Sequence, residues 1–229
     1  LWLGWFGFNA GSALAANEIA GLAFANTMLA PMATAVVWML LDSIRDGKAT
    51  AVGLATAIVV GLVAITPAAG FVSPLSAIAL GALAAFPSYF ALLWRVRTRL
   101  DDSLDVFAAH GVGGLTGAVL TGVFAQESWN GVADGLLFGN PMQVVIQIVA
   151  ILAVIVYTAL GTFVILRAIG LVTALRVSEK TERLGLDVAE HGEQAYTSGE
   201  GAVLLLPSGR ASEAGFVSGA AVKRVGGSA

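Results

Sequence analysis

Two long uncharged stretches dominate the chain and constrain its fold most strongly. No Asp, Glu, Lys or Arg occurs from Ile19 to Leu41, or from Ala49 to Trp94. A helix of about 20 apolar residues crosses a hydrocarbon core of about 30 Å, so the first stretch predicts one membrane span. The second stretch is too long for one crossing. Turn-forming residues near its middle divide it into spans near 49–66 and 75–94.

Three further apolar segments extend this pattern. They are residues 1–16, residues 106–124, and residues 142–173, which follow a proline suited to a helix start. The first is short and closes at Asn17, so we expect the chain to begin inside a membrane helix of a longer protein. The sequence thus predicts an all-α fold, a polytopic membrane helix bundle of about six transmembrane segments. This bundle is expected to occupy residues 1–176, with a tail at 177–229.

The composition supports lipid as the surrounding solvent. Hydrophobic residues make up 57% of the chain and charged residues 12%, whereas about a quarter of a soluble domain is charged. The absence of cysteine excludes disulfides and thiolate metal sites, and no phosphate-binding or dinucleotide-binding motif occurs. A net charge of -3 without a basic stripe argues against nucleic acid binding. We therefore expect no enzyme, no cofactor and no metal site.

The basic residues are confined to alternate connections between the spans. Arg45 and Lys48 lie in one connection, three arginines lie in residues 95–99, and the other basic residues lie at or beyond Arg167. Lys and Arg accumulate in cytoplasmic loops. We therefore expect these connections and the C-terminus to be cytoplasmic, in a plasma membrane protein. The connections without basic residues are 17–18, 66–74 and 125–140.

His110 is the one side chain deep in a span that titrates near neutral pH. A ring facing lipid would leave its N–H and lone pair unsatisfied at a cost of several kcal/mol, so we expect it buried against a cavity or a partner helix. Two roles are open, a hydrogen bond that fastens two helices and a functional site in a passage. Desolvation favours the neutral ring, which offers one donor and one acceptor to an uncharged polar molecule.

The neighbours of this histidine have simpler interpretations. Gly111 and Gly114 follow it, and Gly113 with Gly117 forms a pair of small residues four apart. Such glycines let a second helix approach closely, so their expected role is to hold the histidine against that helix. Asp105 lies five residues before the histidine, near the cytoplasmic end of the span. We expect it to cap the first helical turn.

Helical spacing places Leu1, Trp5, Phe8 and Ser12 on one face of the first segment. Because this segment runs toward the outer side, the serine lies nearest the external water. A cation could meet a hydroxyl and aromatic faces there, since cation–π attraction contributes about 0.5 to 2 kcal/mol. The alternative is an aromatic lipid belt or core packing. At the Thr-Pro pair of residues 66–67, a helix kink and a ligand-facing carbonyl are both open.

Four sequence blocks occur in the order of a known family. They are Gly-Trp-Phe-Gly-Phe-Asn-Ala-Gly-Ser at 4–12, Ala-Ile-Thr-Pro-Ala-Ala-Gly-Phe-Val at 64–72, Leu-Asp-Val-Phe and His-Gly-Val within 104–112, and Gly-Leu-Asp, His-Gly-Glu and Ala-Tyr within 185–196. With these blocks, residues 1 to about 196 resemble the ammonium transporter family, which includes the Rhesus glycoproteins. The resemblance implies the second half of an eleven-helix, inverted-repeat transporter, from a truncated sixth helix to the eleventh.

The resemblance also implies roles for individual residues. Ammonium would be captured and deprotonated at an outer vestibule, and ammonia would pass through a hydrophobic pore lined by histidine. The implied pore residues are Leu1, the gate residue Phe8, Val106 and His110, the second of two pore histidines. The implied recruitment residues are Ser12 and, by a weaker match, Thr66. The implied supporting residues are Trp5, Asp105, Gly111 and Gly114.

The resemblance further implies a homotrimer in the lipid bilayer, and a PII-type signalling protein as a partner at the cytoplasmic face. The first pore histidine of the family belongs to the half that this chain lacks, so the chain alone is not expected to form a pore. An ammonium sensor that signals through its tail is the alternative function. Residues 197–229 depart from the family pattern, and either disorder or a short docking strand at 202–206 fits their composition.

Overall fold

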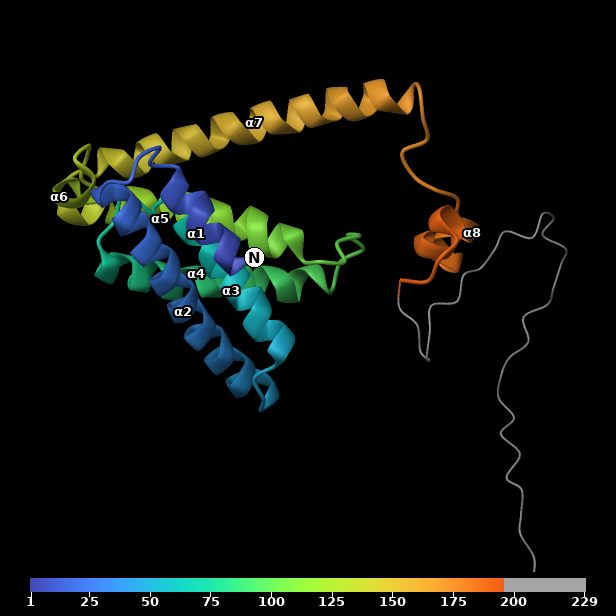
Figure 1. The fold of residues 1–229 in the computed structure, drawn as a ribbon, viewed down its shortest axis with the longest axis horizontal. Helices are drawn as coiled ribbons and strands as arrows, with labels where there is room; N and C mark the ends of the chain where they lie inside the picture. Colours follow the sequence, from blue (N-terminus) through green and yellow to red (C-terminus); the bar gives the residue numbers. More distant parts are fainter. Residues whose placement is uncertain (196–229) are drawn as a thin grey trace, which may run out of the picture. The chain divides into compact units, whose positions relative to one another are not determined.

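The computed structural model describes residues 1–195, which form helices and loops without a regular β-strand (Figure 1). They divide into two compact units, Leu1–Gly161 and a second that begins at Thr162. The elements are α1 (Trp2–Gly11), α2 (Glu18–Asp46), α3 (Ala51–Ile65), α4 (Pro74–Arg95), the π-helix η1 (Phe107–Val112), α5 (Gly113–Phe124), α6 (Glu127–Asn130), the 3-10 helix η2 (Leu136–Phe138), α7 (Met142–Gly170), α8 (Glu179–Leu184) and the π-helix η3 (Asp187–His191).

Each of the six predicted segments corresponds to a helix, which confirms the all-α membrane bundle. Four helical segments are long and apolar enough to cross a membrane, namely α2, α4, η1 with α5, and α7. The other two are shorter, since α3 has 15 residues and α1 has 10. The predictions for residues 197–229 lie outside the described part of the chain.

Capping residues lie close to the predicted helix boundaries. Asn17, Thr50 and Ser73 each accept a backbone N–H at the start of α2, α3 and α4, respectively. These bonds satisfy donors that have no partner within a helix. Gly47 ends α2 with a φ of 73°, a conformation that glycine adopts without strain. The turn at residues 66–73 separates α3 from α4, as the sequence predicts.

Three glycines bring helix backbones into direct contact in the core of the first unit. A β-carbon at any of them would overlap backbone atoms of a facing helix. Helices in lipid associate largely through such close packing, so these crossings attach α3 and α4 to α2, and α5 to α3. The crossing pairs are Gly61 with Pro31, Gly81 with Ala30, and Gly117 with Ala64.

The close approach predicted after the histidine thus occurs at Gly117. A β-carbon on Gly114 would lie 3.7 Å from Val63 Cγ1, and one on Gly111 would lie 3.6 Å from Phe107 Cδ2. Both distances are ordinary van der Waals contacts. Within residues 1–195, neither Gly111 nor Gly114 meets the backbone of another helix, and their supporting role stays a prediction.

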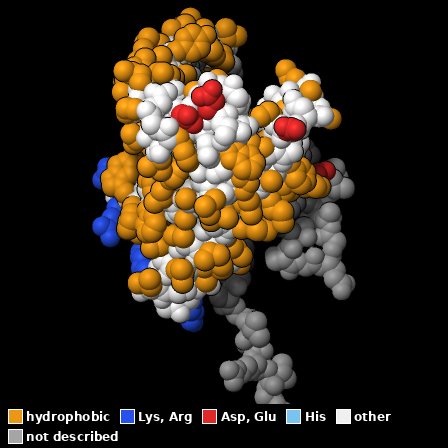
Figure 2. All heavy atoms as spheres, turned by 90° about the vertical axis from the view of Figure 1, so that its left-hand side faces the viewer, with side chains coloured by type: hydrophobic (Ala, Val, Ile, Leu, Met, Phe, Trp, Pro, Cys, Tyr) orange, Lys and Arg blue, Asp and Glu red, His pale blue; other side chains and the backbone are white. Residues whose placement is uncertain are grey.

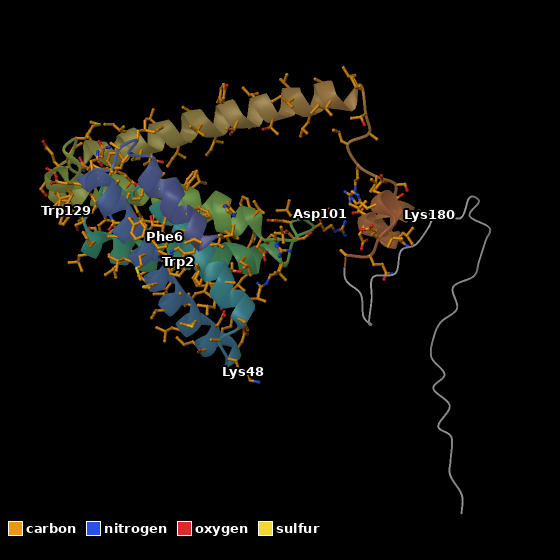
Figure 3. All side chains as sticks on the ribbon, in the orientation of Figure 1. Trp2, Phe6, Lys48, Asp101, Trp129 and Lys180 are labelled. Carbon is orange, nitrogen blue, oxygen red and sulfur yellow. The ribbon has the colours of Figure 1, made fainter. Side chains whose placement is uncertain are left out.

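Two of the loops that lack basic residues meet at one end of the bundle. The side-chain amide of Asn130 donates to the carbonyl oxygen of Phe71 at 3.1 Å, which joins the loop after α5 to the loop after α3. Figure 3 places Trp129, beside this contact, away from Lys48 and Asp101 in the basic connections. This arrangement agrees with the alternation of loops that the charge pattern predicts.

The surface of α7 is apolar and largely uncovered. None of its residues is buried, and its early turns pack on α5, where a β-carbon on Gly122 would lie 2.9 Å from Val144 Cα. Figure 2 shows that hydrophobic side chains dominate the face turned to the viewer. Such a surface suits contact with lipid or further protein rather than water.

Candidate functional site

His110 lies on η1, a wide helical turn in which the hydrogen bonds run from residue i to i+5. Turns of this type are rare and frequently occur at functional sites. Ala108 and Ala109 are 1% and 5% exposed, and Ala109 belongs to a core cluster with residues of α2, α3 and α4. Val106 and His110 are exposed. The imidazole therefore lies off the face that η1 packs against the bundle.

The expectation that His110 is buried is wrong for the described residues. The two alanines occupy the packed face of η1, which leaves the histidine on its free side. Within residues 1–195 the ring has no hydrogen-bond partner on another helix, so the fastening role is not realised there. Val106, four residues earlier, is exposed as well. The pore roles of both residues stay predictions.

Asp102, rather than Asp105, caps the start of this helical segment. Its carboxylate oxygens accept the backbone N–H groups of Val106 and Phe107, each at 2.9 Å. The bond from Phe107, followed by that from Val106, lowers the pKa of Asp102, because both donors favour the charged carboxylate. The expectation that Asp105 caps the turn is wrong, because its carboxylate forms an ion pair with Arg95.

Side-chain hydrogen bonds attach α1 to the bundle. Trp2 Nε1 donates to the carbonyl oxygen of Thr27 at 3.0 Å, and Asn9 Nδ2 donates to Thr27 Oγ1 at 2.9 Å. Trp5 Nε1 donates to Thr66 Oγ1 at 2.8 Å. Sequence reasoning missed the tethers from Trp2 and Asn9. A buried asparagine in an apolar helix is the signal that could have indicated one of them, because a buried amide needs partners.

The predicted face of α1 forms an open hollow. Leu1, Gly4, Trp5 and Phe8 line a space of about 410 Å³, and the leucine and phenylalanine are 90% and 62% exposed. The tryptophan and phenylalanine rings meet edge to face, with centroids 6.1 Å apart. Ser12 follows the end of α1, and its hydroxyl donates to the carbonyl oxygen of Phe8 at 2.8 Å. The serine oxygen therefore keeps its lone pairs for an incoming N–H donor.

Thr66 anchors Trp5. Its hydroxyl accepts the indole N–H and donates to the carbonyl oxygen of Leu62 at 2.7 Å. Because α3 ends at Ile65, Pro67 follows the helix and does not kink it. The carbonyl that the proline leaves without its helical partner is that of Val63, and it accepts the backbone N–H of Thr66 at 3.3 Å. Recruitment of ammonium by Thr66 stays a prediction.

Replacing Thr66 with valine is expected to destabilise the whole protein. The part-buried indole N–H of Trp5 would lose its acceptor, a change that costs about 1 to 3 kcal/mol. The unfolding midpoint of the purified protein in detergent measures this effect. Thr66→Ser keeps the hydroxyl and serves as the control, and equal midpoints for the valine and serine variants would contradict the anchoring role.

Residues 1–195 contain no group of three or more His, Cys, Asp or Glu side chains that could hold a metal ion. The candidate site consists of isolated polar groups on apolar helices. These groups are the imidazole on η1 and the serine oxygen beyond α1. Such an arrangement can orient a small polar molecule by a few hydrogen bonds.

Comparison with known proteins identifies relatives of this chain. Residues 1–196 match the Ammonium Transporter Family. An ammonium transporter of Aquifex aeolicus is 53% identical over 197 residues, which cover 86% of this chain and 46% of that protein. The crystal structure of Saccharomyces cerevisiae Mep2 superposes with a TM-score of 0.72 and 35% identity, covering 80% of this chain and 45% of the other.

A third relative is a solved structure described as a sensor Amt protein. It has a TM-score of 0.72 and 33% identity, over 83% of this chain and 46% of that one. The chain thus spans about half the length of the curated relatives it matches. The family match and the apolar helices make it part of a multi-pass membrane protein. With the family pattern covering the sequence to residue 196 and the same fold in solved relatives, this chain belongs to the ammonium transporter family.

Proposed function

We propose that the whole protein of which this chain is part transports ammonium or ammonia across the plasma membrane, with the C-terminus in the cytoplasm. The observation that carries the proposal is the exposed imidazole of His110, the one ionisable side chain of the apolar segment Phe107–Phe124. A polar ring on the free side of a membrane helix requires a passage or a partner. The relatives named as ammonium transporters support ammonium or ammonia as the transported molecule.

The physical problem is to pass ammonia and refuse potassium, an ion of similar size. A charge at the centre of a bilayer costs at least about 2.5 to 3.5 kcal/mol, so removing a proton before transit is cheaper than carrying the ion. Potassium has no proton to lose. A dry pore that accepts only the neutral molecule therefore excludes potassium by chemistry rather than by size.

Different residues of this chain have different proposed roles in transport. The oxygen of Ser12 accepts an N–H of ammonium, and the ring of Phe8 attracts the cation over its face, with Trp5 packed beside it as support. The phenylalanine then gates the passage to the inside. Ammonia forms hydrogen bonds with the ring nitrogens of His110 and then passes Val106 on its way to the cytoplasm.

The opposite wall of the pore comes from residues that this chain does not contain. Leu1, Phe8, Val106 and His110 all stay exposed within the described residues, and a conduit needs cover on every side. We place this wall in the rest of the subunit, with three subunits in the lipid bilayer. A PII-type signalling protein is the proposed partner at the cytoplasmic face, and family membership is what supports both assignments.

Uptake of labelled methylammonium by the full-length protein, in cells without their own ammonium transporters, tests this function. Saturable uptake that ammonium inhibits and potassium does not is the expected result. No uptake above empty cells, from protein shown to reach the membrane, would refute transport.

The likeness to a sensor Amt protein supports a second candidate, in which the fold reports ammonium to a partner. The same assay separates the two functions. Ammonium binding by the purified protein without uptake would favour the sensor.

Replacing Ser12 with alanine is expected to raise the KM for methylammonium about tenfold, because one hydrogen bond to a charged donor is lost. The maximal rate should change little, since the serine lies outside the pore. Uptake measured over a range of concentrations gives both constants. Ser12→Thr keeps the hydroxyl and should behave as the unmodified protein. A KM for Ser12→Ala equal to that of the threonine control would exclude recruitment at this position.

A further inference from the structure

An ion pair closes the loop between α4 and η1. Arg95, the last residue of α4, contacts the carboxylate of Asp105, and the two side chains are 20% and 24% exposed. The contact joins residues ten positions apart. Trp94 and Phe107, the neighbours on either side of the loop, also meet, with ring centroids 6.1 Å apart. The loop therefore returns η1 to the end of α4 through both a charged and an aromatic contact.

The backbone at Asp105 is held in an unfavourable conformation. Its φ is +54°, in the left-handed region where the β-carbon approaches the carbonyl oxygen. Its own carbonyl accepts the N–H of Ala109 at 2.9 Å, one residue before His110. A residue with a side chain stays in this region only where its surroundings hold it there. The contact with Arg95 supplies such a hold.

The direction of the imidazole depends on this part of the chain. A π-helical turn contains more residues than an α-helical turn, so its start determines which side chain faces the bundle and which faces away. Asp102 binds two N–H groups at that start, and Asp105 lies between this cap and the turn. A shift of one position at Asp105 would exchange the packed Ala109 with the free His110.

We propose that Arg95 is a positioning residue for His110, acting through its ion pair with Asp105 to set the start of η1. This proposal rests on the transport function proposed above, and it adds a residue that touches neither the imidazole nor the hollow beside α1. The competing explanation is that the pair only closes the loop. Loop closure alone would affect the amount of folded protein, whereas positioning affects discrimination between ammonium and potassium.

The test compares five variants of the full-length protein in transporter-deficient cells. They are Arg95→Gln, Asp105→Asn, the charge exchange Arg95→Asp with Asp105→Arg, Arg97→Gln, and His110→Ala as the reference. Arg97 is an exposed arginine of the same loop and is the matched control. Methylammonium uptake and potassium uptake are measured per copy of protein in the membrane. The ratio of the two rates is the readout, since a loss of folded protein lowers both rates equally.

Arg95→Gln and Asp105→Asn are expected to lower methylammonium uptake per copy by up to about a hundredfold, the loss that a misplacement of 1 Å can cause. They should also lower the methylammonium-to-potassium ratio in the same direction as His110→Ala. The charge exchange should recover part of the ratio, and Arg97→Gln should leave it unchanged.

An unchanged ratio in Arg95→Gln, with uptake lost only in proportion to protein abundance, would overturn the positioning role. An equal fall of the ratio in Arg97→Gln would overturn it too, because the effect would then follow loop charge in general. Failure of the transport proposal is separate, since His110→Ala would then leave the ratio unchanged whatever the arginine variants do.

Discussion

Replacing His110 with alanine in the full-length protein is expected to lower methylammonium uptake per copy by about a hundredfold and to end potassium exclusion. Alanine removes the donor and the acceptor that the ring offers to ammonia, so the neutral molecule would lose its polar partner within an apolar segment. The space of the missing ring admits water, and a wet passage no longer separates an ion with a removable proton from one without.

His191→Ala provides the matched control. This histidine is the other one in the chain, and it lies exposed in η3, outside the membrane segments. Uptake and potassium exclusion should be unchanged in this variant. If His110→Ala behaved like His191→Ala in both measurements, the pore role proposed for His110 would have to be abandoned.

The second large effect is expected at a helix crossing. A β-carbon at Gly117 would overlap the carbonyl group of Ala64, so Gly117→Ala forces α5 away from α3. Overpacking of this kind costs about 1 to 3 kcal/mol, and we expect the upper end because both colliding groups belong to helix backbones. The unfolding midpoint of the purified protein, together with its yield from membranes, measures the loss.

Gly114→Ala makes the same chemical change three residues away. A β-carbon there would lie 3.7 Å from Val63 Cγ1, a normal contact, so the midpoint should stay the same or rise slightly. Equal midpoints for the two alanine variants would show that the crossing tolerates separation, contrary to the packing described.

The helices were predictable because the lengths of the uncharged stretches are dictated by the thickness of the bilayer. The face of α1 that contains Leu1, Trp5 and Phe8 was predictable from helical spacing, and the structure gathers these residues around one hollow. Which glycine meets a backbone was not predictable, because Gly113 and Gly117 fit the pattern equally. That choice depends on the angle at which α5 crosses α3.

The environment of the histidine and the identity of the cap could not be derived in the same way. Hydropathy shows that an imidazole in a span needs a partner, and it does not show whether this chain contains that partner. Asp102 and Asp105 are both close enough to the helix start to cap it. The carboxylate of Asp105 pairs with Arg95 and that of Asp102 binds the helix start, and sequence patterns do not report this division.

The attachment of α1 differs from that of the other helices in what it permits. Its glycines have open space around them, and three side-chain hydrogen bonds hold the helix in place. A helix attached through side chains can change its position by substitution of one side chain at a time. The helices packed through glycine keep their spacing. Single substitutions in α1 can therefore reshape the hollow that it lines without disturbing the crossings among α2, α3, α4 and α5.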